Sequence, residues 1–161
     1  MDAPGETVQT RPPGAAEERE LVAACIRCGR CVEVCPYKAI SLAPWTAWRR
    51  YGTPVLTPRD APCELCMKCG DVCPTRALAP VPKQQAGMGI ARVVEADCLA
   101  FQGTVCGLCY KRCPLKDDAI QLDGRLRPHI TEDACVGCGV CLHVCPADTL
   151  AIDLVPTAAG A

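Results

Sequence analysis

Residues 25–36 read CIRCGRCVEVCP, a run with four cysteines at intervals of three, three and four residues and a proline after the last. The same run returns at residues 63–74 (CELCMKCGDVCP) and 135–146 (CVGCGVCLHVCP). Residues 98–114 (CLAFQGTVCGLCYKRCP) repeat it with a longer first gap. These four runs, numbered one to four in chain order, contain all 16 cysteines of the 161-residue chain.

This spacing is typical of [4Fe–4S] ligation, in which three close thiolates bind one cluster and the fourth binds a second cluster. Structural zinc favours two separated pairs of cysteines, and the haem signature C-x-x-C-H is absent. A disulfide scaffold would link neighbouring thiols with little loop closure. The sequence therefore predicts four [4Fe–4S] clusters, with these iron ligands: Cys25, Cys28, Cys31, Cys35, Cys63, Cys66, Cys69, Cys73, Cys98, Cys106, Cys109, Cys113, Cys135, Cys138, Cys141 and Cys145.

The composition argues against several other functions. A net charge of −1 without a basic run does not favour nucleic-acid binding. No stretch reaches the roughly 20 apolar residues of a membrane span, and the N-terminus carries neither an apolar signal segment nor a twin-arginine pair. The chain has two histidines and no phosphate-binding loop, dinucleotide motif or Ser/His/Asp set. We therefore expect no catalytic site of its own.

The segments around the runs predict an α+β fold. Short alternating stretches follow each proline, at residues 39–42, 77–79, 119–122 and 150–154, and two more precede runs three and four at 91–95 and 127–132. Asp123-Gly124 lies between two of them and indicates a hairpin. A repeat of strand, cysteine loop, short helix and strand gives two pseudo-symmetric ferredoxin-like modules. With only six aromatic residues, we expect the clusters to organise the core.

Beyond the cysteines, the chain resembles the four-cluster ferredoxin-type proteins of the NapG/MauM group. The matching motifs are RPPGA at 11–15, ACIRCG at 24–29, GTP at 52–54, RDAPCELC at 59–66, CLAFQG at 98–103 and CGLCY at 106–110. They span about residues 11–155, and the long first gap of run three is part of the pattern. Two features depart from the group: the missing twin-arginine signal and a shorter gap within run two.

The resemblance implies an accessory electron carrier or subunit that links a quinol or other membrane donor to a partner oxidoreductase. It also implies redox protein partners and a location on the periplasmic side, whereas the missing export signal leaves a cytoplasmic location as the alternative. A maturation or assembly factor for a partner redox enzyme is the alternative function.

For the pairing of the runs, we expect nesting, since runs two and three resemble the middle pair of four-cluster subunits of molybdenum oxidoreductases. Nesting groups the cysteines as 25, 28, 31 with 145; 135, 138, 141 with 35; 63, 66, 69 with 113; and 98, 106, 109 with 73. The corresponding organisation is a flexible tail (1–14), an outer module (15–43 with 125–156), an aromatic and basic linker (44–62) and an inner module (63–124). Sequential modules, 15–85 and 88–156, are the alternative.

Two further segments carry expectations. Residues 15–24 predict a helix with acidic residues in its opening turns. The linker holds both tryptophans of the chain, Trp45 and Trp48, beside Arg49. These side chains either cover the clusters by internal packing or form a face that docks a partner, because Trp, Tyr and Arg are enriched at binding hot spots.

Overall fold

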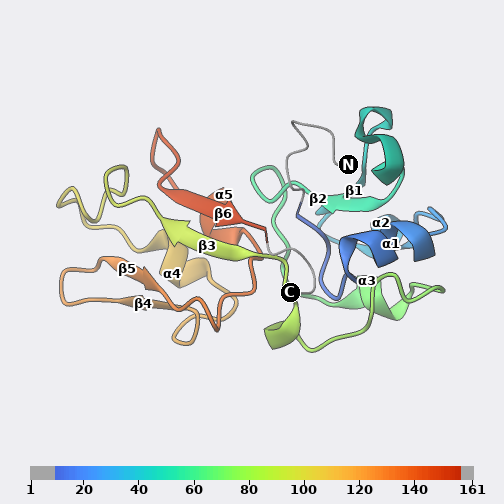
Figure 1. The fold of residues 1–161 in the computed structure, drawn as a ribbon. Coiled ribbons are helices and arrows are strands. Elements are labelled where there is room, and N and C mark those ends of the chain that lie inside the picture. Colours follow the sequence, from blue (N-terminus) through green and yellow to red (C-terminus); the bar gives the residue numbers. More distant parts are fainter. Residues whose placement is uncertain (1–9, 157–161) are drawn as a thin grey trace.

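The computed structural model of the chain describes residues 10–156, in which short helices and strands are joined by long loops (Figure 1). The helices are α1 (Glu18–Ala24), α2 (Arg30–Val34), α3 (Lys68–Asp71), α4 (Leu108–Arg112) and α5 (Val140–His143), with the 3-10 helices η1 (Trp45–Arg50) and η2 (Lys83–Gln85). The strands are β1 (Ile40–Leu42), β2 (Pro54–Leu56), β3 (Ile90–Val93), β4 (Ile120–Leu122), β5 (Pro128–Ile130) and β6 (Ile152–Val155).

Each of the helices α2 to α5 carries the third cysteine of its run and ends just before the fourth. The proline after each fourth cysteine explains this ending, since a residue before proline is disfavoured in the helical region. Cys35 and Cys113 accordingly cap α2 and α4 in extended conformations, with ψ of 107° and 125°. The predicted short helix after each cysteine loop is confirmed.

Three two-stranded antiparallel sheets connect the runs. Strand β1 pairs with β2, β3 with β6, and β4 with β5. The hairpin predicted at Asp123 is confirmed: its N–H donates to the Arg127 carbonyl at 3.0 Å, and its carboxylate accepts from the N–H groups of Arg125 and Arg127. The stretch at 77–79 forms only an isolated bridge, between Leu78 and Ala15.

Residues 44–62 are not a linker between modules. They contain η1 and the strand β2, which returns along β1 and brings run two back beside run one. The sequence did not predict β2, because Pro54 at its start weakens the strand pattern.

The N-terminal segment differs from the predicted tail. Residues 1–9 lie outside the described part, but Thr10, Arg11, Pro12 and Pro13 are buried. Thr10 bridges to Leu56 of β2. The helix α1 begins at Glu18 rather than at residue 15, and its Leu21 is fully buried.

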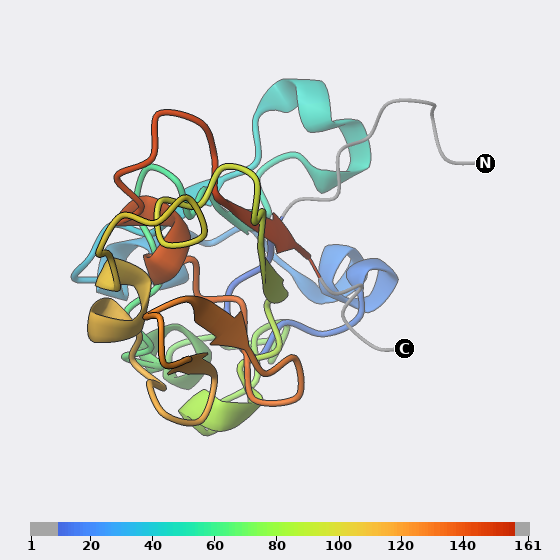
Figure 2. The ribbon, with the colours of Figure 1, turned by 90° about the vertical axis from the view of Figure 1, so that its left-hand side faces the viewer.

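The elements fall into two groups along the chain (Figure 1). Helices α1 to α3 with β1 and β2 form one group, and α4 and α5 with β3 to β6 form the other; Figure 2 views the second group from the front. Backbone hydrogen bonds join them, from Cys63 N–H to the Cys138 carbonyl at 2.9 Å and from Met88 N–H to the Val136 carbonyl at 3.0 Å. A Cβ at Gly137 would lie 2.4 Å from Gly89 N, so the close approach of the two backbones at this point requires glycine.

No helix within residues 10–156 has the length and apolar character needed to span a membrane.

Candidate functional site

Four small cavities are each lined by four cysteines. Three of them have volumes of about 20 Å³ and the fourth, cavity B below, of about 10 Å³. The cysteines are as follows: cavity A, Cys25, Cys28, Cys31 and Cys73; cavity B, Cys35, Cys63, Cys66 and Cys69; cavity C, Cys113, Cys135, Cys138 and Cys141; cavity D, Cys98, Cys106, Cys109 and Cys145. All sixteen cysteines that the sequence singles out thus line these cavities, and all are free thiols.

The nested pairing is wrong. Cys35 lies with run two and not with run four, and Cys73 completes cavity A. The physical reason is the short connection between neighbouring runs: the hairpin of β1 and β2 returns Cys63 to Cys35, and the hairpin of β4 and β5 returns Cys135 to Cys113. The resemblance of runs two and three to the middle pair of four-cluster subunits therefore does not indicate how the runs pair.

The cysteine loops share an unusual backbone conformation. In runs one, two and four, two alternate residues have positive φ: Arg27 and Gly29, Leu65 and Met67, Gly137 and Gly139, with values from 53° to 78°. Such alternation turns successive backbone N–H groups inward and forms a concavity that suits anionic groups. Leu65 and Met67 show that the loop imposes this conformation even without glycine.

Backbone N–H groups from outside the cysteine runs also approach two of the sulfurs. The N–H of Leu78 donates to Cys73 Sγ, and the N–H of Ala91 donates to Cys135 Sγ, both at 3.4 Å. Hydrogen bonds of this kind favour the thiolate, and those from Leu78 and the turn at Thr75 lower the pKa of Cys73 although partial burial opposes them.

All of the other thiols with a shifted pKa have raised values because they are buried. Burial raises the pKa of Cys31, Cys69 and Cys109 to about 11 and that of Cys63 and Cys138 to about 12, with repulsion from neighbouring thiolates as a smaller cause. A thiolate there needs a compensating cation. Binding of a metal group must therefore release protons from these cysteines.

The neighbouring thiols place the four cavities in a row. A thiolate at Cys31 of cavity A would raise the pKa of Cys69 in cavity B, and one at Cys63 of cavity B would raise the pKa of Cys138 in cavity C, so these thiols are neighbours across cavities. Cys109 of cavity D is in the same way a neighbour of Cys141 of cavity C. The order along the molecule is therefore A, B, C, D, with A and D at the ends.

The donor sets fit [4Fe–4S] clusters. Each cavity offers four sulfur ligands, three from one run and one from its neighbour, which is the ligand distribution of two-cluster ferredoxins. The sulfurs surround a space rather than meet at one point. Within residues 10–156, no three His, Cys, Asp or Glu side chains are placed to hold a single metal ion.

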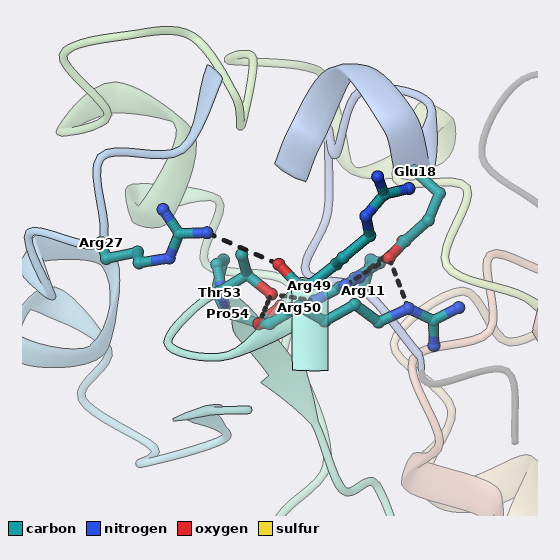
Figure 3. Close-up of polar contacts among 7 residues, drawn as sticks. All are labelled: Arg11, Glu18, Arg27, Arg49, Arg50, Thr53 and Pro54. Atoms are coloured by element: carbon teal, nitrogen blue, oxygen red, sulfur yellow. Dashed lines mark hydrogen bonds and ion pairs between the residues drawn. The ribbon is translucent and has the colours of Figure 1, made fainter. Parts of the chain in front are cut away.

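A buried ion-pair network supports cavity A (Figure 3). Arg11 donates to both carboxylate oxygens of Glu18, at 2.8 and 2.5 Å, and to the hydroxyl of Thr53 at 3.0 Å and the carbonyl of Pro54 at 2.7 Å. Arg50 contacts the same carboxylate at 3.0 Å. Because Pro54 lines cavity A, the network ties the N-terminal segment and α1 to its wall.

Sequence reasoning missed this network, since it placed Arg11 at the end of a flexible tail. The available signal was the rigid Pro12-Pro13 pair after Arg11 together with the acidic first turn of the helix.

Replacing Glu18 by Gln is expected to lower stability by roughly 1 to 2 kcal/mol, because it removes the partner of a buried guanidinium while the carboxylate itself is partly solvated. Burial alone would raise the pKa of Glu18, but the hydrogen bond and charge of Arg11 and the charge of Arg50 hold it below 4.5. The stabilisation is therefore fully present above pH 4.5 and is lost as the pH falls through the folded pKa.

The measurement is thermal unfolding of the holoprotein at pH 5.5 and pH 8, with the exposed Glu20→Gln as the matched control in the same helix. We expect the same deficit for Glu18→Gln at both pH values and none for Glu20→Gln. Equal stability of the two variants would contradict the role of the network.

The paired cysteine loops, short hairpins and sulfur-lined cavities define a ferredoxin-type iron–sulfur protein. Models of the 4Fe-4S dicluster domain match residues 24–77 and 62–117, and another 4Fe-4S dicluster domain model matches residues 91–152. Relatives include the methylamine utilization ferredoxin-type protein MauM of Paracoccus denitrificans, 39% identical over 98% of this chain and 76% of that protein. The ferredoxin-type protein NapG of Escherichia coli is 41% identical over 92% of this chain and 71% of that protein.

A more distant relative is the ferredoxin-type protein NapF of Haemophilus influenzae, 29% identical over 91% of this chain. The identity to MauM and NapG over most of both chains shows the family. The chain belongs to the NapG/MauM family of ferredoxin-type iron–sulfur electron-transfer proteins, which confirms the resemblance drawn from its motifs.

Proposed function

We propose that the chain binds four [4Fe–4S] clusters, one in each of the cavities A to D, and that it carries electrons between a quinol-oxidising or other membrane donor and a partner oxidoreductase. The observation that carries this proposal is the set of four cavities, each lined by three cysteines of one run and one of its neighbour, with cavities B and C joined by the hydrogen bond from Cys63 N–H to the Cys138 carbonyl at 2.9 Å. Bound clusters of this type supply one-electron transfer.

The residues of this chain have three tasks in that function. The cysteines fix the order A to D, so electrons can enter at one end of the molecule and leave at the other. The positive-φ loops direct backbone N–H groups at the sulfurs and stabilise negative charge there. The apolar walls, which include Leu78 in cavity A and Val136 in cavity C, limit the access of water to the cavities.

We also propose that the fold consists of two pseudo-symmetric modules, residues 15–85 and 88–156. Each has a short hairpin between its cysteine runs, β1–β2 in the first and β4–β5 in the second. In each module, the segment before the first run also pairs with the segment after the second run. In the first module this pairing is the single Ala15–Leu78 bridge, and in the second it is the antiparallel pair β3–β6. The periplasmic location stays a prediction.

Deletion of the gene in its native host tests the carrier role, with the partner identified as the oxidoreductase that co-purifies with the chain. We expect the partner isolated from the deletion strain to carry its full cofactor content and to work with an artificial dye donor, while electron flow from quinol stops. A partner that lacks its cofactor would instead identify the chain as a maturation factor and would overturn the proposal.

A further inference from the structure

Exposed hydrophobic side chains are concentrated in the part of the chain around cavity A. Of the eleven large hydrophobic side chains that are exposed in residues 10–156, six lie between residues 26 and 51: Ile26, Tyr37, Leu42, Trp45, Trp48 and Tyr51. The two tryptophans are 80% and 84% exposed, so the structure does not support the alternative in which they pack over the clusters. Figure 2 shows that their segment, η1, stands out from the body of the protein.

The chain holds this segment in an unfavourable backbone conformation. Trp48 has φ of 49° and ψ of −112° and breaks η1 into two turns. A bulky residue in this region is strained, and the conformation persists only where the surroundings maintain it. Arg27 of run one maintains it here: its guanidinium donates to the carbonyl of Tyr51 at 2.7 Å. The same guanidinium donates to the carbonyl of Arg49 at 3.5 Å (Figure 3).

The same surface is basic. The exposed charged residues between 26 and 51 are four basic ones (Arg27, Arg30, Lys38, Arg49) and one acidic one (Glu33), a net charge of +3 in a chain whose total is −1; Arg50 is paired with Glu18. Four thiolates around a cluster core of charge about +2 add about −2 to cavity A, which leaves the surface positive. The whole holoprotein, with four such sites, reaches about −9. The basic region is therefore a local exception on an acidic protein.

Cavity A is also the most accessible of the four. Cys28 is the one exposed cysteine of the sixteen, and none of the cysteines of cavity A is buried, whereas each of the other cavities has at least one buried cysteine. Ile26, Arg27, Arg30 and Leu42 line both this cavity and the basic aromatic surface. Electron transfer weakens steeply with distance, so a protein docked here would face the shortest route to a thiolate-bound group.

We propose that Trp45, Trp48, Tyr51 and Arg49, together with the rim of cavity A, form the docking face for a redox protein with an acidic surface. The inference rests on the proposed electron-transfer function and adds the partner's chemistry and the place of exchange. Charge complementarity identifies the occupant: a basic rim attracts an acidic partner and speeds encounter, while exposed aromatic side chains hold it.

The test uses the anaerobic holoprotein and a purified flavodoxin as an acidic one-electron probe, with binding measured by isothermal titration calorimetry between 20 and 300 mM salt. We expect binding that weakens with salt, and a loss of affinity of roughly ten-fold or more in Trp48→Ala. The same loss is expected in Trp45→Ala, which changes a residue whose backbone is not strained. Arg49→Gln is expected to reduce the salt dependence. The matched controls lie near cavity D, Arg112→Gln for the charge and Val105→Ala for the exposed apolar side chain, and should bind as the parent does.

Iron content and reduction by dithionite followed by reoxidation with a small-molecule oxidant check each variant. If the parent cannot be reduced and reoxidised in this way, the proposed function fails. If it can, but flavodoxin binds without salt dependence or equally well to the Trp48→Ala and control variants, the docking face is wrong. Binding of the face to phosphatidylglycerol vesicles instead of the acidic protein, or a dimer that Trp48→Ala dissociates, would likewise overturn it.

Discussion

Chelation of iron from the anaerobically purified protein is expected to unfold the chain. The core depends on the cysteines themselves: Cys35, Cys63, Cys69 and Cys138 are buried members of its main hydrophobic cluster. The helices α2 to α5 have four or five residues and the sheets have two strands, sizes that are marginal in water without tertiary support. Metal binding in such small domains supplies free energy comparable to the whole stability of roughly 5–15 kcal/mol.

Far-UV circular dichroism during chelation measures this effect. We expect the signal to fall to that of an unfolded chain and to return after reconstitution with iron and sulfide. The control uses the same chelator saturated with iron. A chelated protein that still unfolds cooperatively on heating would show that the apolar contacts suffice.

Pairs of cysteine substitutions are expected to separate sequential from nested pairing. Cys35 and Cys63 share cavity B, so the double variant Cys35→Ala with Cys63→Ala leaves two ligands there and should remove one cluster and leave three. Cys35 and Cys135 line different cavities, so Cys35→Ala with Cys135→Ala should alter two clusters and leave two intact. Nested pairing requires the opposite pattern, because it places Cys35 with Cys135.

Mössbauer spectroscopy of iron-57-labelled protein counts intact [4Fe–4S] clusters in both variants. The two double variants are each other's control, since both remove two thiols and both include Cys35→Ala. Two altered clusters in the Cys35/Cys63 variant would contradict the arrangement of the cavities.

The sequence predicted the parts of the fold that local chemistry determines. Cysteine spacing indicated the residues that line the four cavities, the repeat indicated a short helix at each cysteine loop, and Asp123-Gly124 indicated the hairpin of β4 and β5. Each of these features depends on neighbours within a few residues, so a single sequence contains the signal.

Other features depend on contacts between distant residues and could not be predicted in this way. Arg11 is buried because Glu18 and Thr53 surround it, and Thr53 is 42 residues away in the chain. The strand β2 exists because it pairs with β1 and not because of its own sequence. The pairing of the runs depends on which hairpin returns to which loop, and similarity between loops carries no information about that.

The exposure of Trp45 and Trp48 also depends on contacts beyond the local sequence. Tryptophan side chains suit internal packing as well as docking, and only the path of η1 away from the body of the protein distinguishes the two roles. That path depends on the contacts of Arg27 with the carbonyls of Tyr51 and Arg49, which no local pattern indicates.

Anaerobic stoichiometric titration with dithionite, on protein whose iron, sulfide and zinc contents are measured in the same sample, tests the four-cluster electron carrier most directly. The account predicts about sixteen iron and about sixteen sulfide per chain, no zinc, and about four electrons taken up and returned per chain. Zinc in place of iron, markedly fewer than sixteen irons, or iron that takes up no electrons would contradict it.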